Sequence, residues 1–471
     1  MSAWGSNSAA RSSAPLIARV KENDPTLSSL LILPLKNFTS DDAVSLAAAL
    51  ADNSNLTEIN CSGKTINDDS LKSLGCAIGN SSTIQSIAIG GSSMGTSGLH
   101  SLCCHGLLES KSVGRIDLGF KSITSSANES ESEMLIEVGT ALGSISSLRE
   151  LILHRNEGLK SVGLSHLFKS GFSSLRIVDL SECEIDGIGL ESFSTWLCSR
   201  GDDDNENALN LILNDNPLKI VTPLALPLQK NLIKSLQLKN CGLGDNGIKA
   251  IFDNAAGTVQ EIDVEGNNVT AVGAECIGDF LKAGGGAVES IVLGNNPLTT
   301  AGIQFIADGL VSSGKKLQKL DLSRTDLKTK GATVILGTNV NVVQLRLFAN
   351  NLGKEGIAAC GVVINNNYIT NLDLGGNESS EEGVLELLLN FRQPTAQKVL
   401  ELGGNKCSDQ VHSLLNEIAL TNPELDVARD IPERNQSGNV VSGGTGSFSN
   451  GDTINMSEVN ATMKAAGWKI G

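Results

Sequence analysis

The hydrophobic positions of this chain recur in a fixed order. In the recurring frame, apolar residues stand at positions one, four, six and eleven, and a polar or small residue usually stands at position nine. Clear copies are LQKLDLSRTDL (317–327), VESIVLGNNPL (288–298), VQEIDVEGNNV (259–269) and VVQLRLFANNL (342–352). Two apolar residues that stand two apart face the same side of an extended chain. The frame therefore predicts a short strand with one buried side, followed by a turn.

A helical pattern follows the strands. In AGIQFIADGLVSS (301–313), Ile303, Ile306 and Leu310 are three and four residues apart, which places them on one helix face. The segments 246–252, 272–281 and 381–391 have similar spacing. Each unit is thus one strand and one helix. Because one unit cannot bury its apolar face alone, neighbouring units are expected to stack.

The ninth frame position sets the period and the chemistry of the turn. It occurs thirteen times between residues 64 and 405, about 28 residues apart, within the range of leucine-rich repeats. An Asn side chain there can both donate to and accept from the backbone groups of a buried turn. We expect Cys183, Cys241, Ser92 and Thr325 to do this less completely. Lys64 and Lys121 are expected not to fit in the same way, so that the early repeats are looser. The predicted structural ladder is formed by Asn156, Asn216, Asn267, Asn296, Asn350, Asn377 and Asn405.

A unit of this length with a helix resembles the ribonuclease-inhibitor-like class of leucine-rich repeats, over roughly residues 27–420. The resemblance implies an α/β leucine-rich-repeat solenoid, or horseshoe, of about 13 repeats with parallel strands on its concave face. Residues 1–21 are predicted to be a flexible N-terminus and 22–430 the solenoid. Residues 431–471 are predicted to be a flexible Gly/Ser/Asn-rich tail with a short terminal helix. Two polar, acidic insertions, 124–137 and 199–208, are expected to be surface loops.

Charge and cysteine content limit the classes of partner and the cellular compartment that we expect. The 471 residues carry a net charge of −16, which argues against a nucleic-acid binder. No window has the roughly 20 apolar residues of a membrane span. The ten cysteines are scattered without a CxxC pair, so we expect buried reduced thiols in a cytoplasmic protein. The Ser/Ala-rich residues 1–21 leave import into an organelle open. We expect a monomer that uses no metal and no cofactor.

Sequence signals for catalysis are absent. The sequence contains no GxSxG, HExxH or GxxxxGK[ST] motif, and none of its five histidines lies at metal-ligand spacing from Cys or carboxylates. The Gly-rich segment GGSSMGTSG (90–98) lacks the lysine of a phosphate-binding loop and belongs to the repeat. We therefore expect a protein that is not an enzyme.

The fifth frame position is the candidate binding surface, because it lies between two core positions and points away from the core. Six of its thirteen occurrences are acidic and one is basic. A ladder of carboxylates on neighbouring strands would attract a basic protein partner. A structural use of Asp at this position is the alternative, and Phe348 could pack against the next turn instead. The predicted partner-binding residues are Asp117, Asp179, Asp263, Asp321, Arg346, Phe348, Asp373 and Glu401.

Three functions compete at this stage. The first is a non-catalytic protein-interaction scaffold. The second is a GTPase activator, since the solenoid is similar to the Ran GTPase-activating proteins in repeat length; Arg155 and Asn156 are then the candidate residues, and a small GTPase the partner. The third is an actin-end-binding protein, since IARVKENDPTLSSLLI (17–32) is similar to the segment that opens the repeat domain of tropomodulins.

Overall fold

The computed structural model describes residues 11–125, 129–169, 171–200, 208–255, 257–363, 368–390, 399–421, 425–434 and 440–446. The chain divides into two compact units. The first comprises residues 1–241 with 257–259, and the second comprises residues 242–256 with 260–471. Each unit alternates short strands with helices, as the repeat pattern predicts.

In the first unit, each strand pairs in parallel with the next one along the chain. Its strands are β1 (Ser29–Leu31), β2 (Glu58–Ser62), β3 (Ser86–Gly90), β4 (Arg115–Asp117), β5 (Glu150–Ile152), β6 (Ile177–Asp179), β7 (Leu209–Ile212) and β8 (Ile233–Gln237). Its helices are α2 (Ala14–Lys21), α3 (Ser40–Ala49), α4 (Asp68–Asn80), α5 (Thr96–Cys103), η1 (Leu107–Glu109), α6 (Glu129–Ser144), α7 (Lys160–Leu167), α8 (Gly187–Cys198), η3 (Thr222–Leu224) and α9 (Ala225–Gln229).

The second unit repeats this order, and only its last strand pairs antiparallel. Its strands are β9 (Glu261–Asp263), β10 (Ser290–Val292), β11 (Leu317–Asp321), β12 (Val342–Arg346), β13 (Asn371–Asp373), β14 (Val399–Glu401), β15 (Asp426–Arg434) and β16 (Val440–Gly446). Its helices are α10 (Gly244–Phe252), α11 (Ala271–Lys282), α12 (Thr299–Ser313), α13 (Lys328–Gly337), α14 (Gly353–Val363), α15 (Glu381–Asn390) and α16 (Asp409–Thr421).

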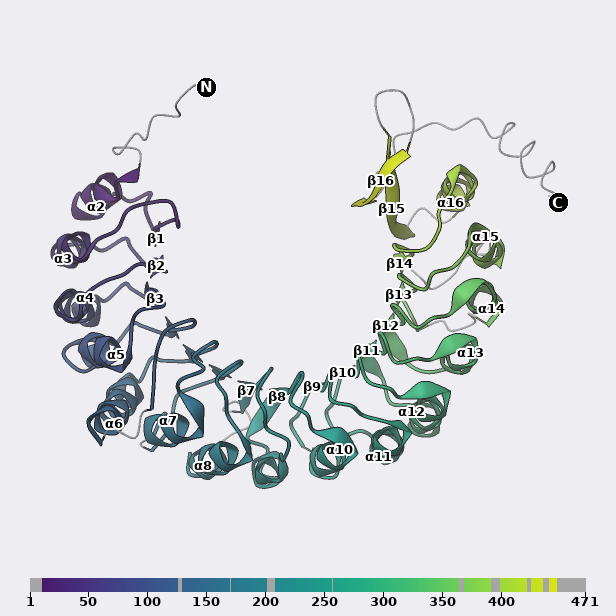
Figure 1. Cartoon of the computed structure of the whole chain (residues 1–471), viewed down its shortest axis with the longest axis horizontal. Helices are drawn as coiled ribbons and strands as arrows, with labels where there is room; N and C mark the ends of the chain where they lie inside the picture. Colours follow the sequence, from purple (N-terminus) through teal and green to yellow (C-terminus); the bar gives the residue numbers. More distant parts are fainter. Residues whose placement is uncertain are drawn as a thin grey trace. The chain divides into compact units, whose positions relative to one another are not determined.

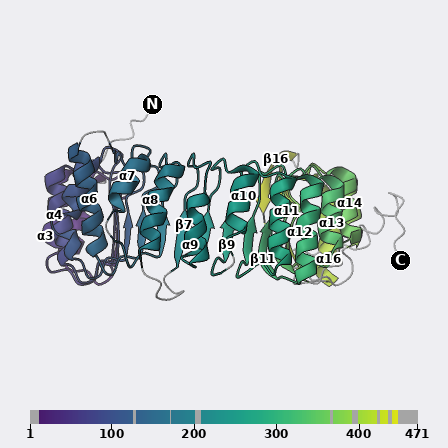
Figure 2. The same cartoon turned by 90° about the horizontal axis from the view of Figure 1, so that it is seen from below.

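The thirteen frame copies coincide with the strands β2 to β14, which confirms the predicted α/β solenoid of parallel strands within each unit. The apolar frame positions are buried, as Leu317 and Leu320 show in β11. Within each unit the helices cover one face of the strands and leave the other face uncovered (Figure 1). The helices of each unit stand side by side (Figure 2). Among the described residues, no helix combines the length and apolar character that a membrane crossing requires.

Glycines in the helices allow neighbouring repeats to approach closely. A side chain added at Gly139 of α6 would collide with the backbone carbonyl oxygen of Leu167 in α7. Gly278 of α11 would place a Cβ 2.5 Å from the carbonyl oxygen of Phe305 in α12. The small residues among the apolar helix positions are therefore contact points between backbones.

The asparagines at the ninth frame position hydrogen-bond successive turns to one another. Asn296 is buried, and its Nδ2 donates to the carbonyl oxygens of Val264, Leu293 and Gly294 at 2.9–3.1 Å. Its Oδ1 accepts from the N–H groups of Asn267 and Val269 in the preceding repeat. Similar bonds, in varying number, are made by Asn216, Asn267, Asn350, Asn377 and Asn405.

Two expectations for the early turns are wrong. The side chain of Lys64 does fit the buried turn. It is buried, and its Nζ donates to the carbonyl oxygens of Leu33, Pro34 and Lys36 at 2.6–3.0 Å. An ammonium group has three donors, so it can replace the Asn amide toward carbonyls. Ser92, in contrast, is exposed. It therefore does not join the buried ladder.

Predictions for the insertions and ends need three corrections. Glu129–Ser144 forms α6 rather than a loop, because Leu135, Val138 and Leu142 face the core at helical spacing and acidic residues fill the first turn. Ala14–Lys21 forms α2, with Ile17 and Val20 buried, rather than a flexible terminus. The predicted tail boundary at residue 430 falls inside β15, which pairs with β16. The expectations for residues 1–10, 201–207 and 447–471 lie outside the described residues.

Candidate functional site

The fifth frame positions stand in register on the uncovered side of the strands. In the first unit the register joins Asn60, Ala88, Asp117, Ile152, Asp179, Ile212 and Gln237. In the second unit it joins Asp263, Val292, Asp321, Arg346, Asp373 and Glu401. Except for Phe348, the predicted partner-binding residues therefore form two columns, one on each unit.

Each aspartate of the columns closes the turn that follows its own strand. The Oδ1 atom of Asp321 accepts from the N–H of Ser323 at 3.0 Å, and that of Asp373 accepts from the N–H of Gly375 at 2.9 Å. The same bond to the residue two positions on is made by Asp117, Asp179 and Asp263. The structural use of Asp, which the sequence left open, is therefore present at all five positions. It engages one carboxylate oxygen of each.

The second carboxylate oxygen lies near a nitrogen of an arginine or histidine side chain in three cases. The Oδ2 atom of Asp117 lies 3.0 Å from Nη2 of Arg115, and that of Asp179 lies 3.6 Å from Nδ1 of His154. The Oδ2 atom of Asp321 lies 3.7 Å from Nη1 of Arg346. Asp321 and Asp373 are buried, with 8% and 9% of their surface exposed. The columns are therefore not open rows of free carboxylates, and the more accessible carboxylates are at Asp117, Asp179, Asp263 and Glu401.

Burial changes the acidity of Asp373. Loss of solvation raises the pKa of its carboxyl to about 6, and the nearby carboxylates of Glu401 and Asp321 act in the same direction. The N–H of Gly375 and the guanidinium of Arg346 oppose this rise without cancelling it. The charged form of Asp373 is therefore disfavoured in the folded protein.

We predict that Asp373→Asn stabilises the protein near pH 7.5 by about 1–3 kcal/mol and leaves its stability at pH 4 unchanged. A folded pKa above the unfolded value means that Asp373 favours folding most at low pH, and that this benefit is lost as the pH rises through 6. Asn keeps the oxygen that accepts from Gly375. Urea unfolding at both pH values measures the effect; a uniform loss of stability at both would show that the charge is needed.

Phe348 packs against the next turn rather than standing free. A Cβ atom at Gly376 would lie 2.8 Å from the Phe348 ring, so the ring covers the Gly376 backbone. The guanidinium carbon of Arg324 lies 5.3 Å from the centre of the same ring. Arg346, which the sequence placed beside Phe348, faces Asp321 instead. Phe348 is half-buried and retains an accessible part.

The proposed activator pair, Arg155 and Asn156, is divided between surface and core. Arg155 is exposed, and its Nε lies 3.1 Å from a carboxylate oxygen of Glu182. Asn156 is fully buried, and its Nδ2 donates to the carbonyl oxygens of Leu118, Leu153 and His154. Asn156 therefore belongs to the structural ladder. Of this pair, only Arg155 is accessible to a partner.

Sequence reasoning missed Phe120, which is 59% exposed and lies under Arg155, with 5.8 Å between the guanidinium carbon and the ring centre. A signal was present in the frame. Phe120 stands at the eighth position, where most repeats have Gly, Asn or Asp.

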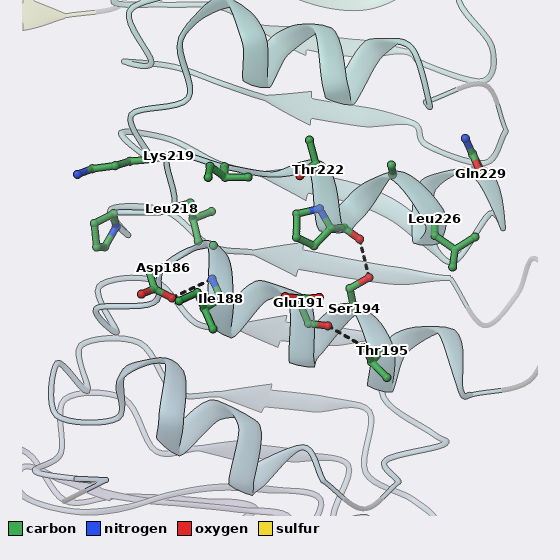
Figure 3. A pocket seen from close by; sticks show the side chains of 15 residues that line it. Asp186, Ile188, Glu191, Ser194, Thr195, Leu218, Lys219, Thr222, Leu226 and Gln229 are labelled. Carbon is green, nitrogen blue, oxygen red and sulfur yellow. Dashed lines mark hydrogen bonds between the residues drawn. The ribbon is translucent and has the colours of Figure 1, made fainter. Parts of the chain in front are cut away.

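Sequence reasoning also missed a groove of about 980 Å³ on the helix side of the first unit, between α8 and α9 (Figure 3). Prolines at 217, 223 and 227 shorten the helical part of this repeat, because proline lacks a backbone donor. The exposed apolar side chains of Ile188, Ile220 and Leu226 line the groove. None of the predicted site residues lies in it.

In the described ranges, no group of three or more His, Cys, Asp or Glu side chains is arranged to hold a metal ion. Burial raises the pKa of the Cys61, Cys183 and Cys360 thiols to about 12, which disfavours their reactive thiolate forms. Cys183 and Cys241 occupy ladder positions and donate to the carbonyl oxygens of Leu153 and Leu213.

Comparison with known proteins identifies the repeat. The family model described as "Leucine Rich repeat" matches residues 173–194, 229–252 and 258–278. A crystal structure of the yeast Rad7–Elc1 complex is similar to this chain at 15% sequence identity and a TM-score of 0.40. The match covers 87% of this chain and 80% of the matched chain. Actin-binding site 2 of leiomodin-1 matches 30% of this chain and 79% of its own, at 16% identity and a TM-score of 0.26. No curated protein matches the sequence.

Proposed function

This chain is a leucine-rich repeat protein, and we propose that it acts as a non-catalytic scaffold or regulator that binds a protein partner on its strand face and rim. The observation that carries the proposal is the uncovered strand face, on which side chains from successive repeats stand in register. Repeat proteins bind partners on the extended surfaces that their neighbouring repeats build together. The accessible carboxylates and the net charge of −16 favour a basic partner.

The test removes charge from the strand face without disturbing its turns. Asp117→Asn and Asp179→Asn keep the oxygen that accepts the turn N–H, as the natural Asn60 does toward Ser62 at 3.2 Å. Glu401→Gln completes a triple variant that lowers the negative charge by three. The matched control, Glu191→Gln with Glu275→Gln and Glu355→Gln, makes the same change on exposed helix residues.

Proteins bound by the full chain are isolated from lysate at 50 and 300 mM salt and identified by mass spectrometry. We expect a basic partner whose binding falls about tenfold in the strand-face variant and not in the helix-side control. The higher salt concentration should weaken it as well. If the strand-face variant bound the partner as strongly as the helix-side control does, the interaction would not lie on the strand face.

A GTPase activator of the Ran GTPase-activating type is a second candidate, because Arg155 is exposed on a turn held by backbone hydrogen bonds. Recovery of a small GTPase from the lysate would favour it. Single-turnover GTP hydrolysis by that GTPase should then accelerate on addition of this protein and return toward the basal rate with Arg155→Ala. An unchanged hydrolysis rate on addition of the wild-type protein would exclude this function for that GTPase.

A further inference from the structure

Three consecutive repeats place large residues at a backbone position that favours small ones. The eighth frame position has a left-handed conformation in every repeat except that of Gly91, and most repeats fill it with Gly, Asn or Asp, which tolerate positive φ. Arg324 is a single large residue at this position in the second unit. Phe120, Arg155 and Glu182 occupy it in the repeats of β4, β5 and β6, with φ values of 57°, 59° and 53°. Because a large side chain is disfavoured there, its retention in three neighbouring repeats calls for a use other than folding.

The fold imposes this conformation through the backbone. The N–H of Phe120 donates to the carbonyl oxygen of His154 at 2.8 Å, and the N–H of Arg155 donates to that of Ser181 at the same distance. The N–H of Glu182 donates to the carbonyl oxygen of Asn214 at 2.9 Å. These bonds continue the strand ladder into the turns and need no particular side chain. The side chains are therefore held in fixed places on the rim, which is the edge formed by the turns that follow the strands.

Arg155 contacts both of the other side chains across the repeats. The Arg155 guanidinium carbon lies 5.8 Å from the centre of the Phe120 ring, and its Nε lies 3.1 Å from Glu182. We call these three residues the rim row. An exposed aromatic ring beside an arginine is the composition typical of residues that dominate binding energy in protein interfaces.

The surrounding charge indicates the partner. Glu157 and Glu184 stand two residues after Arg155 and Glu182, are exposed, and have no ion-pair partner among the described residues. Arg155 is itself paired with Glu182. The exposed Lys160, whose N–H donates to the carbonyl oxygen of Cys183, offsets only one of the two glutamates, so the charge left over beside the rim row is net negative. A cationic side chain near Glu157 and Glu184 and an apolar side chain on Phe120 would satisfy this surface together.

We propose that the rim row is the anchor at which a partner protein docks a Lys or Arg side chain next to an apolar one. The inference rests on the proposed function and names the part of the rim that recognises the partner. It uses Phe120, Glu182, Glu157 and Glu184, which lie outside the strand-face columns.

The first test asks whether Phe120 serves folding or binding. Asn suits the left-handed backbone, so Phe120→Asn should leave the thermal unfolding midpoint unchanged or raise it by about 2–4 °C. Ala349→Asn is the matched control, because Ala349 occupies the same frame position with φ of 52° in the second unit. Ala349→Asn should have the same small effect on the unfolding midpoint and leave binding unchanged. A midpoint lowered by more than about 4 °C in Phe120→Asn alone would make Phe120 a structural residue and overturn the inference.

The second test uses a display library of random 12-residue peptides, selected on the full-length protein and counter-selected on the Phe120→Asn variant. We expect peptides with Lys or Arg within a few residues of an apolar side chain. Their affinity should fall at least tenfold with Phe120→Asn and severalfold with Glu157→Gln plus Glu184→Gln. It should not change with Ala349→Asn. If no selected peptide depends on Phe120, the inference is wrong.

The strand-face triple variant separates this inference from the proposed function. If peptides or lysate partners lose binding in that variant but not in Phe120→Asn, the scaffold function stands and the rim-row anchor is wrong. If neither variant changes the binding of a lysate partner, the binding surface of the proposed function is wrong as well.

Discussion

Replacing Gly139 by alanine is expected to lower the free energy of unfolding by about 3 kcal/mol or more. Gly139 lies in α6, where an added Cβ would collide with the backbone carbonyl oxygen of Leu167 at the end of α7. A backbone atom cannot move aside as the end of a flexible side chain can. The two helices would have to separate, and the apolar contacts between these repeats would loosen. Chemical denaturation followed by circular dichroism measures the change.

Gly171→Ala is the matched control, since a Cβ at Gly171 would meet nothing within 4 Å and its backbone needs no positive φ. We expect a change of less than about 0.5 kcal/mol there. Gly143 provides an intermediate case: its Cβ would lie 2.7 Å from the carbonyl oxygen of Gly171. If Gly139→Ala were as mild as Gly171→Ala, the helices would be free to move apart, and close backbone contact would not limit the stacking.

Asn296→Ala is expected to lower the free energy of unfolding by about 3 kcal/mol. The substitution removes an amide that donates to three carbonyl oxygens and accepts from two N–H groups, all at a buried turn. Alanine can replace none of these bonds, and the turn is too deep for bulk water to satisfy the groups at no cost. The loss should appear as a lower midpoint in urea unfolding.

Ser323→Ala provides the comparison within the next repeat. Ser323 is half-buried, and its hydroxyl donates to Asp321 at 2.6 Å, so its removal should cost under about 1 kcal/mol. Similar losses at Asn296 and Ser323 would contradict the assignment of the ninth frame position as the buried one. They would imply that the turn is satisfied mainly by its own backbone.

The strand-face columns and the rim row differ in what explains their residues. Their aspartates close turns through one oxygen, which explains the choice of Asp at this position without any partner. The rim row has no comparable local explanation, because Phe120, Arg155 and Glu182 are large side chains in left-handed turns. The rim row is therefore the more informative place to look for a partner.

The repeat, its strands and its ladder could be predicted from the sequence because they depend on local spacing. Alternation in LQKLDLSRTDL fixes which side of β11 is buried, and recurrence about every 28 residues implies stacking. Composition was a weaker guide where it competed with periodicity. The acidic stretch after residue 124 suggested a loop, but Leu135 and Val138 at helical spacing made it the start of α6.

Contacts between repeats were decided only by the tertiary structure. Lys64 reaches carbonyls about 30 residues away, Asp373 is buried among Asp321, Arg346 and Glu401, and Phe120 meets an arginine 35 residues later. The frame predicts which positions share a column. The frame does not predict how deeply a side chain is buried, or which neighbouring residue it contacts. Those outcomes depend on how closely successive turns stack, which variable insertions and small residues determine together.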